Sequence, residues 1–156
     1  MNINIIGVPI MYGCGRAGVE EGPNSLREAG MIDIFARNKR NKIYDMGNLY
    51  VPEVDKKDKY RSHNQMKYLD PIMEVNANLS HMVYMSLRSN SFPLVIGGDH
   101  SLGLGSIAGA SRFYENIAVI WIDAHGDIND HKTSPSGNIH GMSLAASFGV
   151  GDPTLK

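Results

Sequence analysis

The sequence predicts an α/β fold built on a parallel sheet. Four short apolar segments, at residues 3–8, 42–46, 94–96 and 117–122, have the composition of strands. The last two are almost continuously rich in valine and isoleucine, which is typical of strands covered on both faces. Segments with helical periodicity lie between these strands, and this alternation favours parallel strands joined by right-handed crossovers.

Three helices are expected from start signals and apolar periodicity. The first covers residues 23–35, where a first-turn proline precedes apolar residues at three- and four-residue steps. The second covers residues 70–90, beginning with an aspartate cap and a proline. The third covers residues 101–111, with Ser101 as its cap. The densely charged segment 53–61 is expected to be a solvated loop.

Composition limits the classes of function. The chain has 156 residues, the size of one ordinary domain, and its 15 basic and 16 acidic residues give a net charge of −1. This balance provides no strong field, so neither nucleic acid nor a membrane surface is expected as a partner. The longest apolar run, at residues 117–122, is far shorter than the ~20 residues of a membrane-spanning helix. No basic residue precedes Arg16 and Cys14 is the single cysteine, so a cytoplasmic location is expected.

A glycine-rich segment after the first strand formally matches the dinucleotide-binding fingerprint. It has the sequence Gly-Cys-Gly-Arg-Ala-Gly at residues 13–18. In dinucleotide sites the strand leads directly into the first glycine, and a helix begins at the last one. Here residues 9–12 intervene and Gly22-Pro23 interrupts the chain soon afterwards, so a surface turn is favoured over a nucleotide site.

The strongest chemical signal follows the third and fourth predicted strands. Asp123, His125 and Asp127 stand at alternate positions directly after the fourth strand. His100 follows the third strand, and the carboxyl ends of parallel strands meet at one edge of the sheet. If the chain stays extended, the three alternating side chains point to one side. Imidazole and carboxylate without thiolates suit divalent metal ions, and two such ions can lower the pKa of a bridging water. Asp99 either orients His100 or is an ordinary turn carboxylate.

With these motifs the chain resembles the ureohydrolase superfamily and, within it, the arginase family. The matching stretches are Gly-Val-Glu-Glu-Gly-Pro at 18–23, Gly-Gly-Asp-His-Ser at 97–101, Asp-Ala-His-Gly-Asp-Ile-Asn at 123–129 and Ser-Gly-Asn-Ile-His-Gly at 136–141. The two metal motifs indicate the superfamily, whereas the Asp-Ile-Asn extension and the last stretch favour arginase over agmatinase. Residues 1–156 are therefore expected to be the N-terminal portion of a single arginase-like domain.

The resemblance implies a three-layer α/β/α fold with a parallel sheet and a centre of two Mn²⁺ ions. The implied reaction is hydrolysis of L-arginine to L-ornithine and urea by a hydroxide that bridges the metal ions. The resemblance also implies that the full-length protein is a homo-oligomer, either a trimer or a hexamer. Carried over by position, the implied metal ligands are His100, Asp123, His125 and Asp127, the proton shuttle is His140, and the residues that bind the α-amino and α-carboxylate groups are Asn129, Ser134, Ser136 and Asn138.

The chain departs from the family pattern because the later Asp-x-Asp metal motif is missing. Two Mn²⁺ ions carry four positive charges, whereas Asp123 and Asp127 supply two negative ones, so at most one weakly held ion is expected. The resemblance also implies that strands of the missing half lie beside segment 117–122, which is then left with an unpaired edge. A complementing C-terminal half is the expected partner, and the chain alone is expected to be weakly active or inactive. The alternatives are an agmatinase or another ureohydrolase of a guanidino substrate, and a non-catalytic fragment that binds a partner through this edge.

Overall fold

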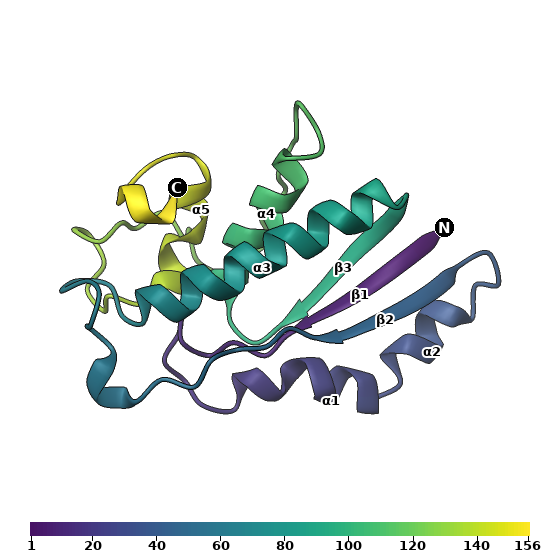
Figure 1. Ribbon diagram of the computed structural model, residues 1–156, viewed down its shortest axis with the longest axis horizontal. Coiled ribbons are helices and arrows are strands. Elements are labelled where there is room, and N and C mark those ends of the chain that lie inside the picture. The colour runs from purple at the N-terminus through teal and green to yellow at the C-terminus, as the bar shows by residue number, and fades with distance from the viewer.

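The computed structural model describes residues 1–156, and a three-stranded parallel sheet lies at its centre (Figure 1). The strands are β1 (Asn2–Val8), β2 (Lys42–Asn48) and β3 (Ser91–Gly97), in the order β2-β1-β3. β1 is parallel to both of its neighbours. The three carboxyl ends therefore lie at the same edge of the sheet, and the predicted α/β fold with a parallel sheet is confirmed.

Helices cover both faces of this sheet. In Figure 1, α1 (Gly22–Glu28) and α2 (Met31–Ala36) lie below the sheet. The long helix α3 (Leu69–Arg88) lies above it, and α4 (Gly103–Ser111) packs against α3. No helix combines the length and the apolarity that crossing a membrane would require.

The side chains of β1 show why both faces need a cover. Ile3 and Ile5 belong to a small apolar cluster that also includes side chains of α2. Ile6 and Val8 point the other way, into the main core, which is formed largely by α3. All four side chains are almost fully buried. The central strand is therefore apolar on both faces, as expected for a sheet between two helical layers.

The first helical segment consists of two helices, where the sequence predicts one over residues 23–35. α1 ends at Glu28 and α2 begins at Met31, directly after Gly30. The φ of Gly30 is 82°, in the left-handed region that glycine adopts without strain. This residue therefore turns the chain between the two helices. The second prediction, a helix over residues 70–90, agrees with α3 to within two residues at each end.

The predicted cap of the third helix is wrong. The structure places a 3-10 turn at His100–Leu102 before α4, and its cap is Asp99, whose side chain accepts a hydrogen bond from the Ser101 N–H. Ser101 itself is fully buried. Aspartate is as good a cap as serine, and here the side chain of Asp99 rather than that of Ser101 makes the capping hydrogen bond.

The predicted fourth strand is also wrong. Residues 117–122 have no regular structure and pair with no strand. Ile120 and Ile122 are 87% and 91% exposed. An extended segment becomes a strand only when a neighbour satisfies its N–H and C=O groups, and the free edge of β3 does not pair with this segment.

Short elements complete the chain. The helix α5 (Ser143–Ser147) follows the last loop. The charged segment 53–61 is mainly an exposed loop, as expected, and residues 13–18 form turns with Gly18 in the left-handed region. Single 3-10 turns lie at Val19–Glu21, Lys56–Asp58, His100–Leu102, Ile139–Met142 and Pro153–Leu155.

Candidate metal centre

Three of the predicted metal-binding side chains meet beyond the carboxyl end of β3. His100 Nδ1 lies 2.8 Å from Asp123 Oδ2 and 3.0 Å from Asp127 Oδ2. One ligand atom from each of the three residues lies within 4.8 Å of the others. No other group of three or more histidine, cysteine, aspartate or glutamate side chains is this compact.

His100 is held in place by the turn that follows β3. The neighbouring Asp99 accepts hydrogen bonds from the N–H groups of Ser101, at 2.9 Å, and Gly13, at 2.8 Å. Its carboxylate therefore ties the loop after β1 to the turn that carries His100. Of the two roles considered for Asp99, these contacts are those of a turn carboxylate.

Asp127 is fixed by its backbone and buried. Its carbonyl accepts the N–H groups of Leu144 and Ala145 in α5, both at 3.1 Å. Its side chain is 6% exposed, and its Oδ2 is buried without a hydrogen-bond partner. The Asp127 φ of 49° is left-handed, and the chain bends at residues 124–125. The expected extended conformation of residues 123–127 is therefore wrong.

This bend separates His125 from the other three residues. Its side chain is 81% exposed, and its Nδ1 lies 3.1 Å from Asp123 Oδ1. His125 thus contacts the far oxygen of Asp123 and lies outside the compact His100–Asp123–Asp127 group. In an extended chain the His125 side chain would point to the same side as those of Asp123 and Asp127. The bend at residues 124–125 turns it away from them.

The charge state of Asp123 suits cation binding. The backbone N–H of His125 donates to its Oδ1 at 2.8 Å and is the main cause that lowers the Asp123 pKa below its usual range. The rings of His125 and His100 lower this pKa further. The carboxylate is therefore ionised at neutral pH, which is the form that binds a cation.

The donor set fits a divalent metal ion. One imidazole and two carboxylates, with no thiolate, are ligands that Mn²⁺ accepts. The Nδ1 atom of His100 carries at most one proton, so it can satisfy only one of the two facing carboxylates. The buried Asp127 Oδ2 then lacks a donor, which is an unfavourable state that a cation would relieve. These observations support a His–Asp–Asp site for one metal ion.

Trp121 is part of this site, although the sequence analysis did not single it out. Its ring stacks on the ring of His100, with 4.3 Å between centroids and 20° between planes. The sequence feature that could have indicated this role is the position of Trp121, in the apolar segment 117–122 and two residues before the candidate ligand Asp123. Trp121 thereby packs segment 117–122 against a candidate metal ligand.

The predicted substrate-binding residues lie on a loop that is closed by its own hydrogen bonds. Ser134 Oγ accepts the Gly137 N–H at 3.0 Å, and Ser136 Oγ accepts the Asn138 N–H at 3.2 Å. The Asn138 side chain donates through Nδ2 to the Cys14 carbonyl at 3.0 Å. These contacts hold the loop against the turn that follows β1.

The same loop places the predicted proton shuttle. The His140 N–H donates to the Gly13 carbonyl at 3.3 Å, at the start of a 3-10 turn. Asn129 is exposed, and its N–H donates to the Gly141 carbonyl at 3.2 Å. Because Gly13 also contacts Asp99, the loop of His140 and the turn of His100 share one anchoring segment.

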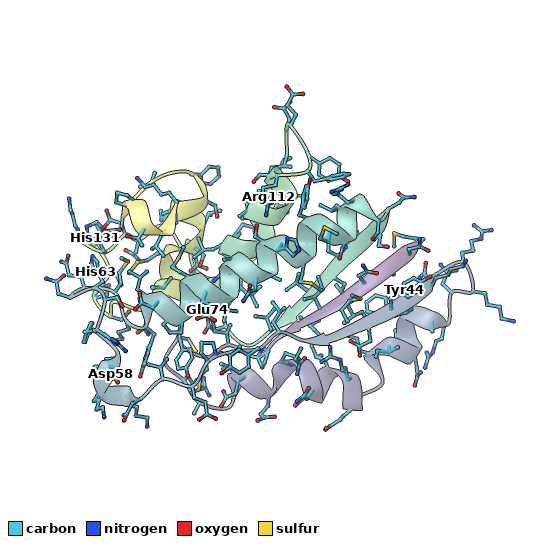
Figure 2. All side chains as sticks on the ribbon, in the orientation of Figure 1. Tyr44, Asp58, His63, Glu74, Arg112 and His131 are labelled. Atoms are coloured by element: carbon cyan, nitrogen blue, oxygen red, sulfur yellow. The ribbon has the colours of Figure 1, made fainter.

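A second cluster of titratable side chains lies where Figure 2 labels His63 and His131. His63 Nε2 and His131 Nδ1 lie 3.4 and 3.9 Å from Asp152 Oδ2. The other ring nitrogen of His63 accepts the N–H groups of Gln65 and Met66, so the proton of the neutral ring lies on Nε2 and faces Asp152. A metal ion would need that Nε2 lone pair. The cluster is therefore a tether between loops rather than a second metal site.

Comparison with known proteins identifies relatives along almost the whole chain. A sequence model described as the Arginase family matches residues 1–153. The arginase of Brevibacillus brevis is 44% identical over 154 residues, which are 99% of this chain and 50% of the relative. The chain thus spans about half the length of the curated relatives it matches.

Solved structures give the same result. The native structure of Bacillus caldovelox arginase at pH 5.6 superposes with a TM-score of 0.89 at 42% identity, over 99% of this chain and 51% of that one. The structure of Entamoeba histolytica arginase in complex with L-ornithine superposes with a TM-score of 0.87 at 34% identity, over 99% and 52%. The chain therefore covers half of the fold of these proteins.

Proposed function

The chain belongs to the arginase family, and we propose that the protein is an arginase that uses Mn²⁺ to hydrolyse L-arginine to L-ornithine and urea. The observation that carries this proposal is the meeting of His100, Asp123 and Asp127 around a buried oxygen without a donor. A relative at 34% identity binds L-ornithine, the product of this reaction, which supports the same substrate class.

In this proposal, His100, Asp123 and Asp127 hold the metal ion. His125 is a fourth candidate, because its exposed ring already contacts the Asp123 carboxylate. The bound metal would supply a Lewis acid that makes water acidic enough to attack a guanidinium carbon near neutral pH. Asp123 and Asp127 neutralise the charge of one divalent ion but not of two. The site also has few protein ligands, so we propose that this chain alone holds one ion, and holds it weakly.

The other residues of the site bind substrate and move a proton. His140 carries a proton to the leaving amine of L-ornithine, because an imidazole ring can both accept and donate a proton. The hydroxyl and amide groups of the loop recognise the zwitterionic head group of the substrate through hydrogen bonds. The residues proposed for this recognition are Asn129, Ser134, Ser136 and Asn138.

We also propose that residues 1–156 are the N-terminal portion of one domain. The chain matches about half of each relative, and apolar side chains of residues 117–122 stay exposed. A complementing second half would cover this surface and supply further acidic ligands. The activity of the chain alone would then be weak or absent.

Urea release from L-arginine in the presence of Mn²⁺ tests the proposed function. We expect the protein that contains this chain together with the complementing second half, called here the full gene product, to hydrolyse L-arginine and to act poorly on agmatine. Asp127→Asn removes the buried ligand and is expected to lower kcat/KM by about 100-fold or more. The matched control is Asp33→Asn, an exposed acid on α2.

Three outcomes would contradict this proposal. Absence of urea from the full gene product with Mn²⁺ would exclude an arginase. Faster hydrolysis of agmatine than of L-arginine would instead show agmatinase-type specificity. Equal activity of wild type and Asp127→Asn would separate the reaction from the His–Asp–Asp site.

A further inference from the structure

We propose that Lys67 is a positioning residue for substrate recognition: its ammonium group orients the side-chain amide of Asn138 and selects ligands that carry an α-carboxylate. The inference rests on the proposed function, because it places Asn138 in the substrate site. Lys67 belongs to none of the sequence motifs. Its partner Asn138 lies 71 residues further along the chain, so the contact is visible only in the folded structure.

Lys67 and the substrate loop are joined by backbone and side chain. The Lys67 N–H donates to the Gly137 carbonyl at 2.9 Å, and its Nζ donates to Asn138 Oδ1 at 3.0 Å. Gly137 has a φ of 69°, and a Cβ atom there would lie 2.5 Å from the carbonyl oxygen of Gln65. The loop and the segment before α3 are therefore in direct contact.

The segment that carries Lys67 is itself fixed. Met66 is fully buried in the main core. The ring of His63 accepts the N–H groups of Gln65 and Met66, and its other nitrogen faces Asp152. The ammonium group of Lys67 therefore extends from a rigid base toward Asn138.

The contacts of Asn138 leave its amide only one orientation. An ammonium group can only donate, so the atom that faces Lys67 is the oxygen. A carbonyl can only accept, so the atom that faces Cys14 is the nitrogen. One N–H of the Asn138 amide is then still free, as are two N–H groups of the Lys67 ammonium. Together they form a set of donors that suits a carboxylate.

Lys67 also lacks a countercharge. The ion pairs of the chain involve other residues, so no carboxylate lies within 4 Å of its Nζ. The residue is partly buried, and a partly buried cation is stabilised by a nearby anion. The α-carboxylate of L-arginine is such an anion, whereas agmatine has none. Lys67 therefore gives a chemical reason for preferring L-arginine.

The position of Asn138 relative to the metal centre supports this role. Asn138 contacts Cys14, and the adjacent Gly13 contacts both Asp99 and His140. Asp99 directly precedes His100 in the turn that carries this candidate ligand. The Lys67–Asn138 pair is thus linked to the turn of His100 through the loop after β1.

Binding of two diamines that differ by one carboxylate tests the inference directly. Titration calorimetry on the Mn²⁺-loaded full gene product compares L-ornithine with putrescine. We expect the wild type to prefer L-ornithine, and Lys67→Met to weaken L-ornithine binding about tenfold while leaving putrescine binding unchanged. Lys67→Arg keeps the charge and is expected to restore most of the preference. The matched control is Lys39→Met. It removes an exposed lysine that precedes the amino end of β2, whereas the candidate site lies at the carboxyl end of the sheet.

Kinetics distinguish positioning from a structural role. Lys67→Met is expected to raise KM for L-arginine with little change in kcat, and to leave agmatine hydrolysis unchanged. A fall of the melting temperature together with equal losses for both substrates would show a merely structural lysine and overturn the inference. Retention of the L-ornithine preference in Lys67→Met, or binding of neither diamine by the wild type, would also overturn it. A Lys67-dependent preference without urea release would uphold the inference and reject the proposed function.

Discussion

Asp99 and Asp127 are both buried acids, and their oxygens are satisfied in opposite ways. Asp99 accepts two backbone N–H groups, whereas Asp127 Oδ2 accepts none. A buried carboxylate without donors is unfavourable unless a cation is near, so Asp127 faces the metal position and Asp99 supports the turn. The sequence placed both acids in motifs but could not separate their roles, because Gly13, the partner that satisfies Asp99, lies 86 residues away.

A residue-scale prediction concerns the pair of Arg27 and Asp45. Arg27 Nε and Nη2 each donate to the Asp45 carboxylate at 2.8 Å, and these hydrogen bonds hold the Asp45 pKa below its usual range. Because this pKa is lower in the folded chain than in the unfolded one, the pair stabilises the fold above pH ~4. The stabilisation is lost as the pH falls through the folded-state pKa. Arg27→Gln is therefore expected to lower the free energy of unfolding by about 1 kcal/mol at pH 7.

Urea unfolding at pH 7 and at pH 3 checks this prediction. The difference between wild type and Arg27→Gln should shrink at the lower pH, because pH 3 lies below the usual pKa of an aspartate, so that protonation of Asp45 in the unfolded chain reduces the stabilisation. Lys57→Gln is the control, since Lys57 and Asp55 are 76% and 59% exposed and their pair is screened by water. A difference that is the same at both pH values would contradict the assigned ion pair.

At the scale of elements, the contact between α3 and α4 depends on small residues. Gly105 donates its N–H to the side chain of Asn76 at 2.7 Å, and a Cβ atom on Gly105 would lie 2.5 Å from the Asn76 carbonyl oxygen. In an open helix, replacing glycine by alanine stabilises by about 1 kcal/mol. Here we expect Gly105→Ala to destabilise the chain by about 1–3 kcal/mol, because the two helices must move apart.

Thermal or urea denaturation measures the sign of that change. Ser106→Ala on the same helix is the control, and its effect should stay within about 0.5 kcal/mol. A stabilised Gly105→Ala variant would show that α3 and α4 are packed less closely than the structure indicates.

The elements that the sequence predicted well are those that local pattern defines. β1, β2 and β3 and the long helix α3 each carry their own apolar pattern or start signal. The break at Gly30 depends on a single left-handed residue within a continuous apolar periodicity, so the pattern did not reveal it. Segment 117–122 has the composition of a strand, but its conformation depends on a neighbour that this chain does not provide.

The site was predictable to a similar extent. The motifs gave the residue types of the metal centre and their place at the edge of the sheet. The bend at residues 124–125, the stacking of Trp121 and the contact of Lys67 with Asn138 required the folded chain. These features depend on tertiary contacts, which periodicity and spacing do not encode.

At the scale of the whole molecule, apolar side chains are exposed at a groove and in the neighbouring segment 117–122. A groove of about 780 Å³ opens between α3, α4 and α5, and it is lined mainly by apolar side chains that include Ile117 and Phe148. Ile120 and Ile122 stand almost fully exposed nearby in the sequence. Surfaces of this kind promote association.

The 156-residue chain is therefore expected to self-associate. The double variant Ile120→Lys with Ile122→Lys should lower the association measured by sedimentation velocity, with the melting temperature unchanged. Ile34→Lys, at a residue 56% exposed on α2, is the control outside this surface. A wild-type chain that stays monomeric at all concentrations would contradict the prediction.

The central claim is that His100, Asp123 and Asp127 hold one metal ion, and the stoichiometry of Mn²⁺ binding tests it most directly. Titration of the 156-residue chain is expected to give one weakly bound ion, which is lost in Asp127→Asn and retained in Asp152→Asn, a variant of the loop tether. Two tightly bound ions, no bound ion, or binding that persists in Asp127→Asn would contradict the account.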